Sequence, residues 1–302
     1  MERLMISTGR THLAMITQSV GALINIVLDP LFIFTFGLGI RGAAIATVLG
    51  QIVAFIVALI LNQAYNKEIH LTPKGFAPDG KMIGRIYAIG VPSIVMASIG
   101  SIMNILLNNI LLSFNTATAP TGEYAQNAFG AYFKLQSFVF MPVFGLNNGI
   151  VPIVAYNYGA QKRKRMTRTA FLGALFAAGY MLLGLAVYQL FPEQLARIFL
   201  TVEDAVMLAI PAMRIISLSF IFAGACIIMG SVFQALGKSI FSMFTSITRQ
   251  LVVLIPVAFL LSLLGNVDLV WWAFPIAEVF SAIASVAFFV YLYKKVISKI
   301  PE

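Results

Sequence analysis

Residues 40–62 read IRGAAIATVLGQIVAFIVALILN and decide the fold class, because they hold one charge, Arg41, close to their start. A helix of about 20 apolar residues is long enough to cross the roughly 30 Å hydrocarbon core of a bilayer. Seven further stretches share this character, so eight spans are expected: residues 12–34, 40–62, 85–113, 127–155, 169–191, 206–235, 240–264 and 270–293. The sequence therefore predicts an all-α, polytopic membrane protein.

The composition excludes several other classes of protein. Hydrophobic residues make up 60% of the chain and charged residues 10%, whereas soluble domains carry about 25% charged residues. The net charge of +9 comes from short gaps between apolar runs and not from a basic face, so no nucleic-acid partner is expected. Two isolated histidines and one cysteine form no metal cluster. We expect that the protein is not an enzyme and that it needs no organic cofactor and no obligate protein partner.

The basic residues predict the orientation in the membrane, since Lys and Arg accumulate in cytoplasmic loops. With the N-terminus inside, 15 of the 20 Lys and Arg residues fall on the cytoplasmic side. Arg41 and Arg197 fall on the opposite side, and Lys134, Arg214 and Arg249 fall within spans. We therefore expect a multi-pass protein of the cell (inner) membrane with both termini in the cytoplasm.

A polar, turn-rich stretch at residues 64–84 predicts a cytoplasmic linker between two parts, residues 1–63 and 85–302. The two parts contain a weak internal repeat, so that the first two spans resemble the last two. At an offset of 228 the matched pairs are Gly9/Gly237, Met15/Met243, Thr17/Thr245 and Leu23/Leu251. Parallel repeats of this kind are typical of transporters, whose substrate site lies between the repeats.

Several motifs resemble a known family of transporters. The segments NIVLDPLFIF (residues 25–34) and GIRGAAIAT (residues 39–47) are similar to the fifth and sixth helices of the multidrug and toxic compound extrusion (MATE) family. Later segments resemble its eighth helix and its tenth-to-eleventh helix region: Leu135–Ser137, Met141–Pro142, Phe144–Leu146, Tyr156–Ala160, Phe233–Lys238, Arg249–Gln250 and Ile255–Pro256.

The resemblance implies an architecture and an activity. Family members have two six-helix lobes, so residues 1–63 correspond to two helices of an N-terminal lobe, and residues 85–302 to a six-helix C-terminal lobe. The implied function is secondary-active multidrug efflux, in which H⁺ or Na⁺ is exchanged for organic, often cationic, amphipathic drugs or dyes. Two alternatives stay open: a lipid-linked oligosaccharide flippase, which a cationic groove would favour, and an inactive fragment that lacks the first four helices and their acid.

Asp29 is the first candidate for function, because an acid at mid-bilayer costs about 2.5–3.5 kcal/mol or more. Asn25 lies one helical turn away on the same face, and Thr47 lies at a similar depth on the following span. The resemblance implies that Asn25, Asp29 and Thr47 form a cation or proton site, and Na⁺ at Asp29 is the only metal expected. Alternatively, Asp29-Pro30 ends a helix and the carboxylate reaches the outer surface.

Glu278 is the second acid within a span, and we expect the buried bases of the same lobe to neutralise it or to hold an anionic substrate group. The alternative is a set of internal ion pairs that fix helix packing. Asn104 and Asn108 share one helix face, where they could line a cavity or bond between helices. The candidates for the substrate cavity are Asn104, Asn108, Lys134, Gln136, Arg214, Arg249 and Glu278.

Overall fold

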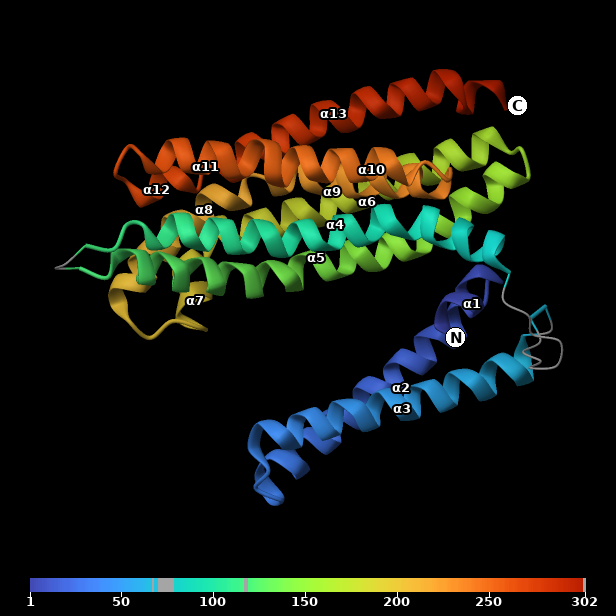
Figure 1. The fold of residues 1–302 in the computed structure, drawn as a ribbon, viewed down its shortest axis with the longest axis horizontal. Coiled ribbons are helices and arrows are strands. Elements are labelled where there is room, and N and C mark those ends of the chain that lie inside the picture. Colours follow the sequence, from blue (N-terminus) through green and yellow to red (C-terminus); the bar gives the residue numbers. More distant parts are fainter. Residues whose placement is uncertain (67, 70–78, 117–118, 301–302) are drawn as a thin grey trace. The chain divides into compact units, whose positions relative to one another are not determined.

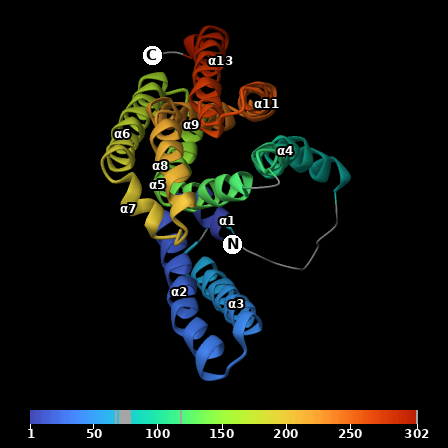
Figure 2. The same cartoon turned by 90° about the vertical axis from the view of Figure 1, so that its left-hand side faces the viewer.

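The computed structural model describes residues 1–66, 68–69, 79–116 and 119–300. The chain divides into two units, Met1–Asp79 and Gly80–Glu302, and every regular element among the described residues is helical (Figures 1 and 2). The boundary falls inside the expected linker at residues 64–84. Residues 67 and 70–78 of that linker lie outside the described residues.

The N-terminal unit is a helical hairpin with a short helix before it. Its elements are α1 (Glu2–Ser7), α2 (Thr11–Pro30), the π-helical segment η1 (Leu31–Thr35) and α3 (Gly39–Tyr65). Small residues allow α3 to pack closely against α2 and η1: a Cβ atom on Gly21 of α2 would lie 3.0 Å from the Cβ of Ala54, and one on Gly42 of α3 would lie 2.6 Å from the carbonyl oxygen of Phe32 in η1. Small residues at such contacts are typical of helix pairs in membranes.

The C-terminal unit contains the remaining helices. They are α4 (Gly80–Leu112), α5 (Thr121–Gly159), α6 (Arg163–Leu190), α7 (Pro192–Arg197), α8 (Glu203–Ser217), α9 (Phe220–Ala235), α10 (Ser239–Ile247), π-helical η2 (Thr248–Leu254), α11 (Ile255–Ser262), α12 (Val267–Val270), α13 (Ala273–Lys295) and η3 (Ile297–Lys299). Across the described residues of both units, seven helices are long and apolar enough to cross a membrane, and α8 with α9 makes an eighth when the bent pair counts as one span. The prediction of about eight spans, two in one unit and six in the other, is confirmed.

The sixth expected span, residues 206–235, differs from the prediction because it is bent by 52° between α8 and α9. At the break, the N–H of Ser219 donates to the carbonyl of Ile216 over 3.0 Å, and the hydroxyl of Ser219 donates to the same oxygen over 2.7 Å. Bonds to a residue three positions back tighten the helix, and a back-bonded hydroxyl favours bending. A hydropathy pattern carries no sign of such a break.

Aromatic side chains hold the centre of the C-terminal unit together. The rings of Phe129 and Trp271 stack with centroids 6.4 Å apart. Tyr188 meets Tyr132 edge-on at 6.0 Å and Phe220 at 5.3 Å. All five side chains are almost completely buried, so α5, α6, α9 and the start of the last span share one aromatic core.

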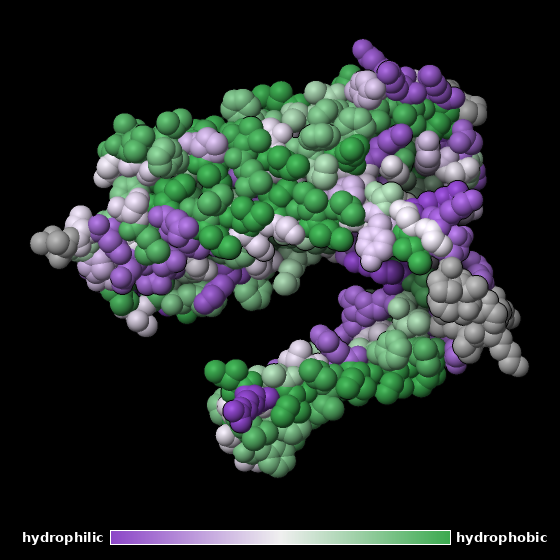
Figure 3. Space-filling model, in the orientation of Figure 1, coloured by the Kyte–Doolittle hydropathy of each residue, from purple (hydrophilic) through white to green (hydrophobic). Residues whose placement is uncertain are grey.

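On the face that Figure 3 shows, the C-terminal unit is apolar over most of the middle of its helices, and hydrophilic residues gather toward the helix ends. On α6, for example, Phe171, Phe176 and Leu183 are 68%, 68% and 67% exposed. Exposed apolar area on this scale would make a soluble protein aggregate, but hydrocarbon chains cover it without cost. The chain is a multi-pass membrane protein.

The two segments of the predicted repeat begin with the same turn. The N–H of Arg10 donates to the carbonyl of Met5 over 2.8 Å, and the N–H of Lys238 donates to that of Phe233 over the same distance. These four residues are related by the offset of 228. The glycines between them, Gly9 and Gly237, have φ of +77° and +69°, a conformation in which glycine ends a helix without steric strain.

Helix packing in the C-terminal unit gives a testable prediction at Gly224, where α9 contacts α6. A Cβ atom there would lie 2.9 Å from the carbonyl oxygen of Ala177, which is backbone and has no rotamer to change. Gly224→Ala is expected to lower the free energy of unfolding by about 1–3 kcal/mol. Thermal unfolding of the purified protein in detergent measures this effect.

Gly179 provides the matched control, because it lies on α6 with nothing within 4 Å of an added Cβ. Gly179→Ala is expected to leave stability unchanged or to raise it by up to about 1 kcal/mol through helix propensity. Equal unfolding temperatures for the two variants would contradict the close α6–α9 contact.

Candidate functional site

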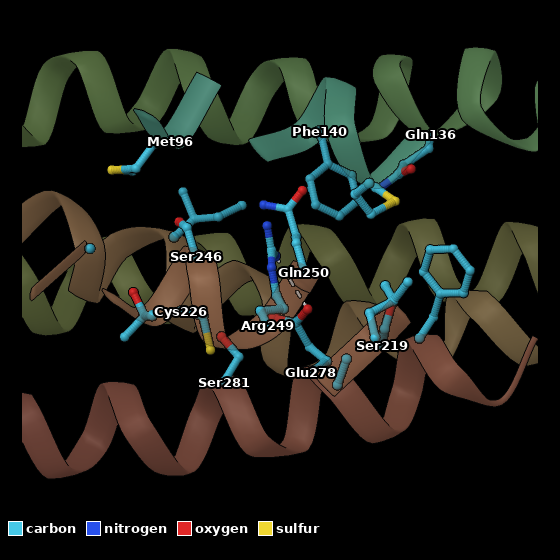
Figure 4. A pocket seen from close by; sticks show the side chains of 18 of the residues that line it. Met96, Gln136, Phe140, Ser219, Cys226, Ser246, Arg249, Gln250, Glu278 and Ser281 are labelled. Atoms are coloured by element: carbon cyan, nitrogen blue, oxygen red, sulfur yellow. Dashed lines mark hydrogen bonds and ion pairs between the residues drawn. The ribbon is translucent and has the colours of Figure 1, made fainter. Parts of the chain in front are cut away.

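The C-terminal unit contains a partly open cavity of about 500 Å³ (Figure 4). Its walls come from α4, α5, α9, α10, η2 and α13. Cavities of this size accommodate a drug-sized molecule, and sites between the helices of a bundle are common places for ligands. This cavity is therefore the candidate binding site of the unit.

The wall formed by α4 and α5 is largely apolar. Met96, Met103, Phe133, Phe140 and Met141 line it. Methionine and phenylalanine offer broad, polarisable surface, and the flexible methionine side chain adapts to ligands of different shape. This wall suits an apolar frame without selecting one shape.

The opposite wall is polar and comes from two helices with suitable spacing. On α13 the lining residues Phe274, Ala277, Glu278, Ser281 and Ser285 recur every three or four positions, so they share one helix face. The lining residues of α10 and η2 follow a similar spacing: Ser242, Thr245, Ser246, Arg249 and Gln250. Each helix thus turns a polar stripe toward the cavity and apolar residues away from it.

An ion pair lies in this polar wall, as Figure 4 shows. Nη1 of Arg249 lies 3.3 Å from Oε2 of Glu278. The Arg249 side chain is 29% exposed, whereas that of Glu278 is 7% exposed. The second carboxylate oxygen, Oε1, is buried and accepts no hydrogen bond from any described residue. The pair is therefore neutral overall, but its acceptor capacity is not used up.

The hydroxyl groups nearby are already donors to the backbone. Oγ of Ser242 donates to the carbonyl of Gly230 on α9 over 2.8 Å, and Oγ1 of Thr245 donates to the carbonyl of Ser242 over 2.9 Å. Their oxygen lone pairs remain available as acceptors. The wall can therefore accept hydrogen bonds from a ligand at several points.

The structure brings three of the seven predicted cavity residues together, namely Gln136, Arg249 and Glu278. Asn104 and Asn108 do not line this cavity, and the amide of Asn108 donates to Oδ1 of Asn104 over 2.7 Å. This bond follows the helix face that they share.

The expectation that all three bases within spans are buried is wrong for Lys134 and Arg214, which are exposed on the C-terminal unit and do not line the cavity. Lys134 lies over the ring of Phe199, 5.2 Å from its centroid. Both residues do fall within helices, α5 and α8, as predicted. Hydropathy places a base within a span, but it does not show which face of the helix carries that base.

The cavity also contains residues that the sequence did not single out, above all the aromatic side chains and the serines. Tyr132, Phe140, Ser246, Ser281 and Ser285 are among them. A usable signal was present, because polar residues repeated every three or four positions in an otherwise apolar helix predict one polar face.

In the N-terminal unit, Asn25 and Asp29 lie half-buried on α2. Oδ1 of each is buried and accepts no hydrogen bond from a described residue. Asn25 faces α3, since a Cβ atom on Gly50 would lie 3.7 Å from the Asn25 Cβ. Thr47 is exposed on α3, and its hydroxyl donates to the carbonyl of Ala43 over 2.9 Å.

Two oxygens one helical turn apart, neither of which accepts a hydrogen bond from a described residue, are suitable ligands for a hard cation or acceptors for a proton. Among the described residues no group of three or more His, Cys, Asp or Glu side chains is placed to hold a metal ion. The carboxylate of Asp29 brings one negative charge and Asn25 brings a neutral oxygen, so one monovalent cation or one proton would balance the charge of this pair.

Comparison with known sequences points to one family. A sequence model of the MatE family matches residues 97–260, more than half of the chain. The multidrug export protein MepA of Staphylococcus haemolyticus (strain JCSC1435) is 27% identical over 270 residues, which cover 89% of this chain and 58% of that protein. MepA of Staphylococcus aureus (strain MSSA476) is 25% identical over 279 residues, which cover 92% and 59%. The chain spans less than two thirds of the length of these relatives.

Solved structures share the fold. One, an outward-facing conformation of a multidrug resistance MATE family transporter of the MOP superfamily, has a TM-score of 0.86 and 23% identity, and the match covers 99% of this chain and 65% of that one. Another is a MOP superfamily transporter from Pyrococcus furiosus, for which a binding pocket of reverse polarity suggests a different function. Its TM-score is 0.83 at 24% identity, with 97% and 64% coverage.

The ion pair gives a prediction about stability. Arg249→Gln leaves the 7%-exposed Glu278 without its counter-charge, and this is expected to cost about 3–5 kcal/mol of unfolding free energy. Glu278→Gln is expected to cost less, because Arg249 is 29% exposed and water in the cavity can hydrate it. Thermal unfolding of the two single variants and of the double variant measures their order of stability.

The double variant Arg249→Gln/Glu278→Gln is the control, because it removes both charges while it keeps similar volume. It is expected to be more stable than Arg249→Gln alone. If the two single variants were equally stable, the unequal burial of the pair would have no energetic consequence and the prediction would be wrong.

Proposed function

We propose that this chain, which belongs to the MatE family, works in secondary-active multidrug export, exchanging H⁺ or Na⁺ for organic, often cationic, amphipathic compounds. The family match confirms the predicted resemblance, and members of this family are transporters and not enzymes. The observation that carries the proposal is the cavity, in which an apolar wall faces a polar wall inside a bundle of membrane-spanning helices.

We assign the coupling cation to the N-terminal unit, at Asn25, Asp29 and Thr47. The support is the buried Oδ1 atoms of Asn25 and Asp29, which accept no hydrogen bond from a described residue. A carboxylate in such a place is stabilised when it gains a proton or a cation and is costly when it stays bare. Binding of the coupling ion would therefore stabilise this hairpin, and release of the ion would destabilise it.

The proposed location is the cell membrane, with both termini on the cytoplasmic side. The support is the distribution of Lys and Arg, which favours that orientation in 15 of 20 cases. Small organic molecules are the proposed substrates, and relatives named multidrug export proteins support this class.

The flippase alternative needs a strongly cationic groove. Among the residues that line the cavity, Arg249 is the single base, and Glu278 neutralises it. Lys134 and Arg214 lie outside the lining. The charge of this cavity therefore favours the multidrug exporter over a lipid-linked oligosaccharide flippase.

Asp29→Asn tests the coupling site. The substitution keeps the size of the side chain but removes its charge, so gradient-driven efflux of a fluorescent dye is expected to fall by about tenfold or more. Efflux is measured in cells without their own exporters, under a H⁺ gradient and then under a Na⁺ gradient, and the gradient that supports efflux identifies the ion.

Asp204→Asn is the matched control, because Asp204 is exposed in the first turn of α8 and should leave efflux unchanged. Wild-type rates from Asp29→Asn would refute the coupling site. Dye efflux that survives collapse of both gradients would refute ion-coupled export itself.

A further inference from the structure

We propose that the cavity of the C-terminal unit binds zwitterions, organic molecules that carry both an ammonium group and an anionic group on an apolar frame. The inference rests on the proposed function, because it names the class of compound that the exporter would bind at this site. Arg249 and Glu278, the two charged residues of the polar wall, are the groups that determine which charge on a ligand is favoured.

Net charge is the first reason. Arg249 and Glu278 are the charged residues among those that line the cavity, so the described lining is neutral. A ligand with one net charge would leave that charge uncompensated next to a neutral and largely apolar lining, which is costly. A zwitterion adds no net charge while it still offers both signs.

Unused hydrogen-bonding capacity is the second reason. A guanidinium has five N–H donors, and among the described residues the Arg249 guanidinium bonds Glu278 through Nη1. Its side chain is 29% exposed, so donors remain for an anionic group. Oε2 of Glu278 bonds Arg249, and a carboxylate oxygen can accept more than one hydrogen bond, so Oε2 keeps capacity for an ammonium group.

The geometry of the carboxylate allows this use. Glu278 lines the cavity with Oε1 buried in the wall, so a ligand would meet the carboxylate at Oε2, the oxygen that also bonds Arg249. An incoming ammonium group can therefore share the carboxylate with Arg249. A purely structural pair has less reason to lie in a cavity with one partner open and one oxygen unpaired.

The rest of the cavity fits the frame of such a ligand. Its volume of about 500 Å³ leaves room for an apolar frame beside the ammonium and anionic groups of the ligand. Phe133, Phe140 and Phe274 offer aromatic surface within the same cavity. Ring faces stack on an aromatic frame and also attract an ammonium group. The structure thus places an apolar subsite next to a pair of opposite charges.

The test uses one frame in four charge states. The dipeptide Phe-Phe is the zwitterion, its amide is the cation, its N-acetyl form is the anion, and the N-acetyl amide is neutral. Isothermal titration calorimetry of the full chain in lipid nanodiscs, without any ion gradient, compares the four. Phe-Phe is expected to bind at least about tenfold more tightly than each of the other three, because each of those loses a charge-assisted bond.

Variants then test the assignment of the residues. Glu278→Gln leaves Arg249 as the only charge of the lining, so the preference is expected to pass to the N-acetyl anion. Arg249→Gln/Glu278→Gln is expected to bind all four forms within about threefold of one another. Lys134→Gln is the matched control, since it removes a charge from the same unit outside the cavity and should keep the wild-type preference.

The wild-type series decides the proposal even if a variant does not fold. Equal or tighter binding of the amide, or no binding of any form, would overturn the proposal, as would an unchanged preference in Glu278→Gln. Because no gradient is applied, a loss of ion-driven efflux contradicts the proposed function alone. Intact efflux without a preference for the zwitterion contradicts this site alone.

Discussion

Hydrocarbon offers no hydrogen-bond partner, so each polar group that the chain carries into the bilayer must find its partner within the protein. Helices satisfy the backbone, and hydroxyl groups such as that of Thr17 donate back to their own helix, to Leu13 over 3.0 Å. Among the described residues, eight buried side-chain atoms lack such a partner, and they include one oxygen each of Asn25, Asp29 and Glu278. Asp29 and Glu278 are the acids of this set that lie within the spans expected from the sequence, where a charge is costly unless it is compensated.

The two acids differ in their surroundings, and this difference divides the chemistry between the units. Glu278 already has a counter-charge in Arg249, 3.3 Å away. Asp29 has no ion-pair partner among the described residues, so its charge would be balanced by a bound cation or removed by a proton. The first environment suits a ligand that needs both signs, and the second suits a coupling ion. This contrast supports the assignment of coupling to one unit and of ligand binding to the other.

The sequence predicted the spans well, because hydropathy over 20 residues averages out local detail. It did not predict the partner of Glu278, since Lys134, Arg214 and Arg249 all fall within spans and differ only in the helix face that carries them. Arg249 lies in the π-helical segment Thr248–Leu254, where the wider turn shifts each following side chain relative to a regular helix. The spacing of three or four residues still aligns Arg249 with Ser242 and Thr245 on the polar face, but hydropathy alone does not show which of the three bases meets Glu278.

Departures from regular helix coincide with the cavity elsewhere as well. Ser219, at the 52° bend between α8 and α9, lines the cavity, as does Arg249 in the π-helical segment. Regular helices that pack by their side chains leave few voids larger than a water molecule. A bundle opens an internal space when a helix turns away from its neighbour or widens, and both changes also aim a polar group at the opening. The irregular positions thus lie beside the space for a ligand and supply polar groups to it, which is where agreement between local sequence and fold is expected to be weakest.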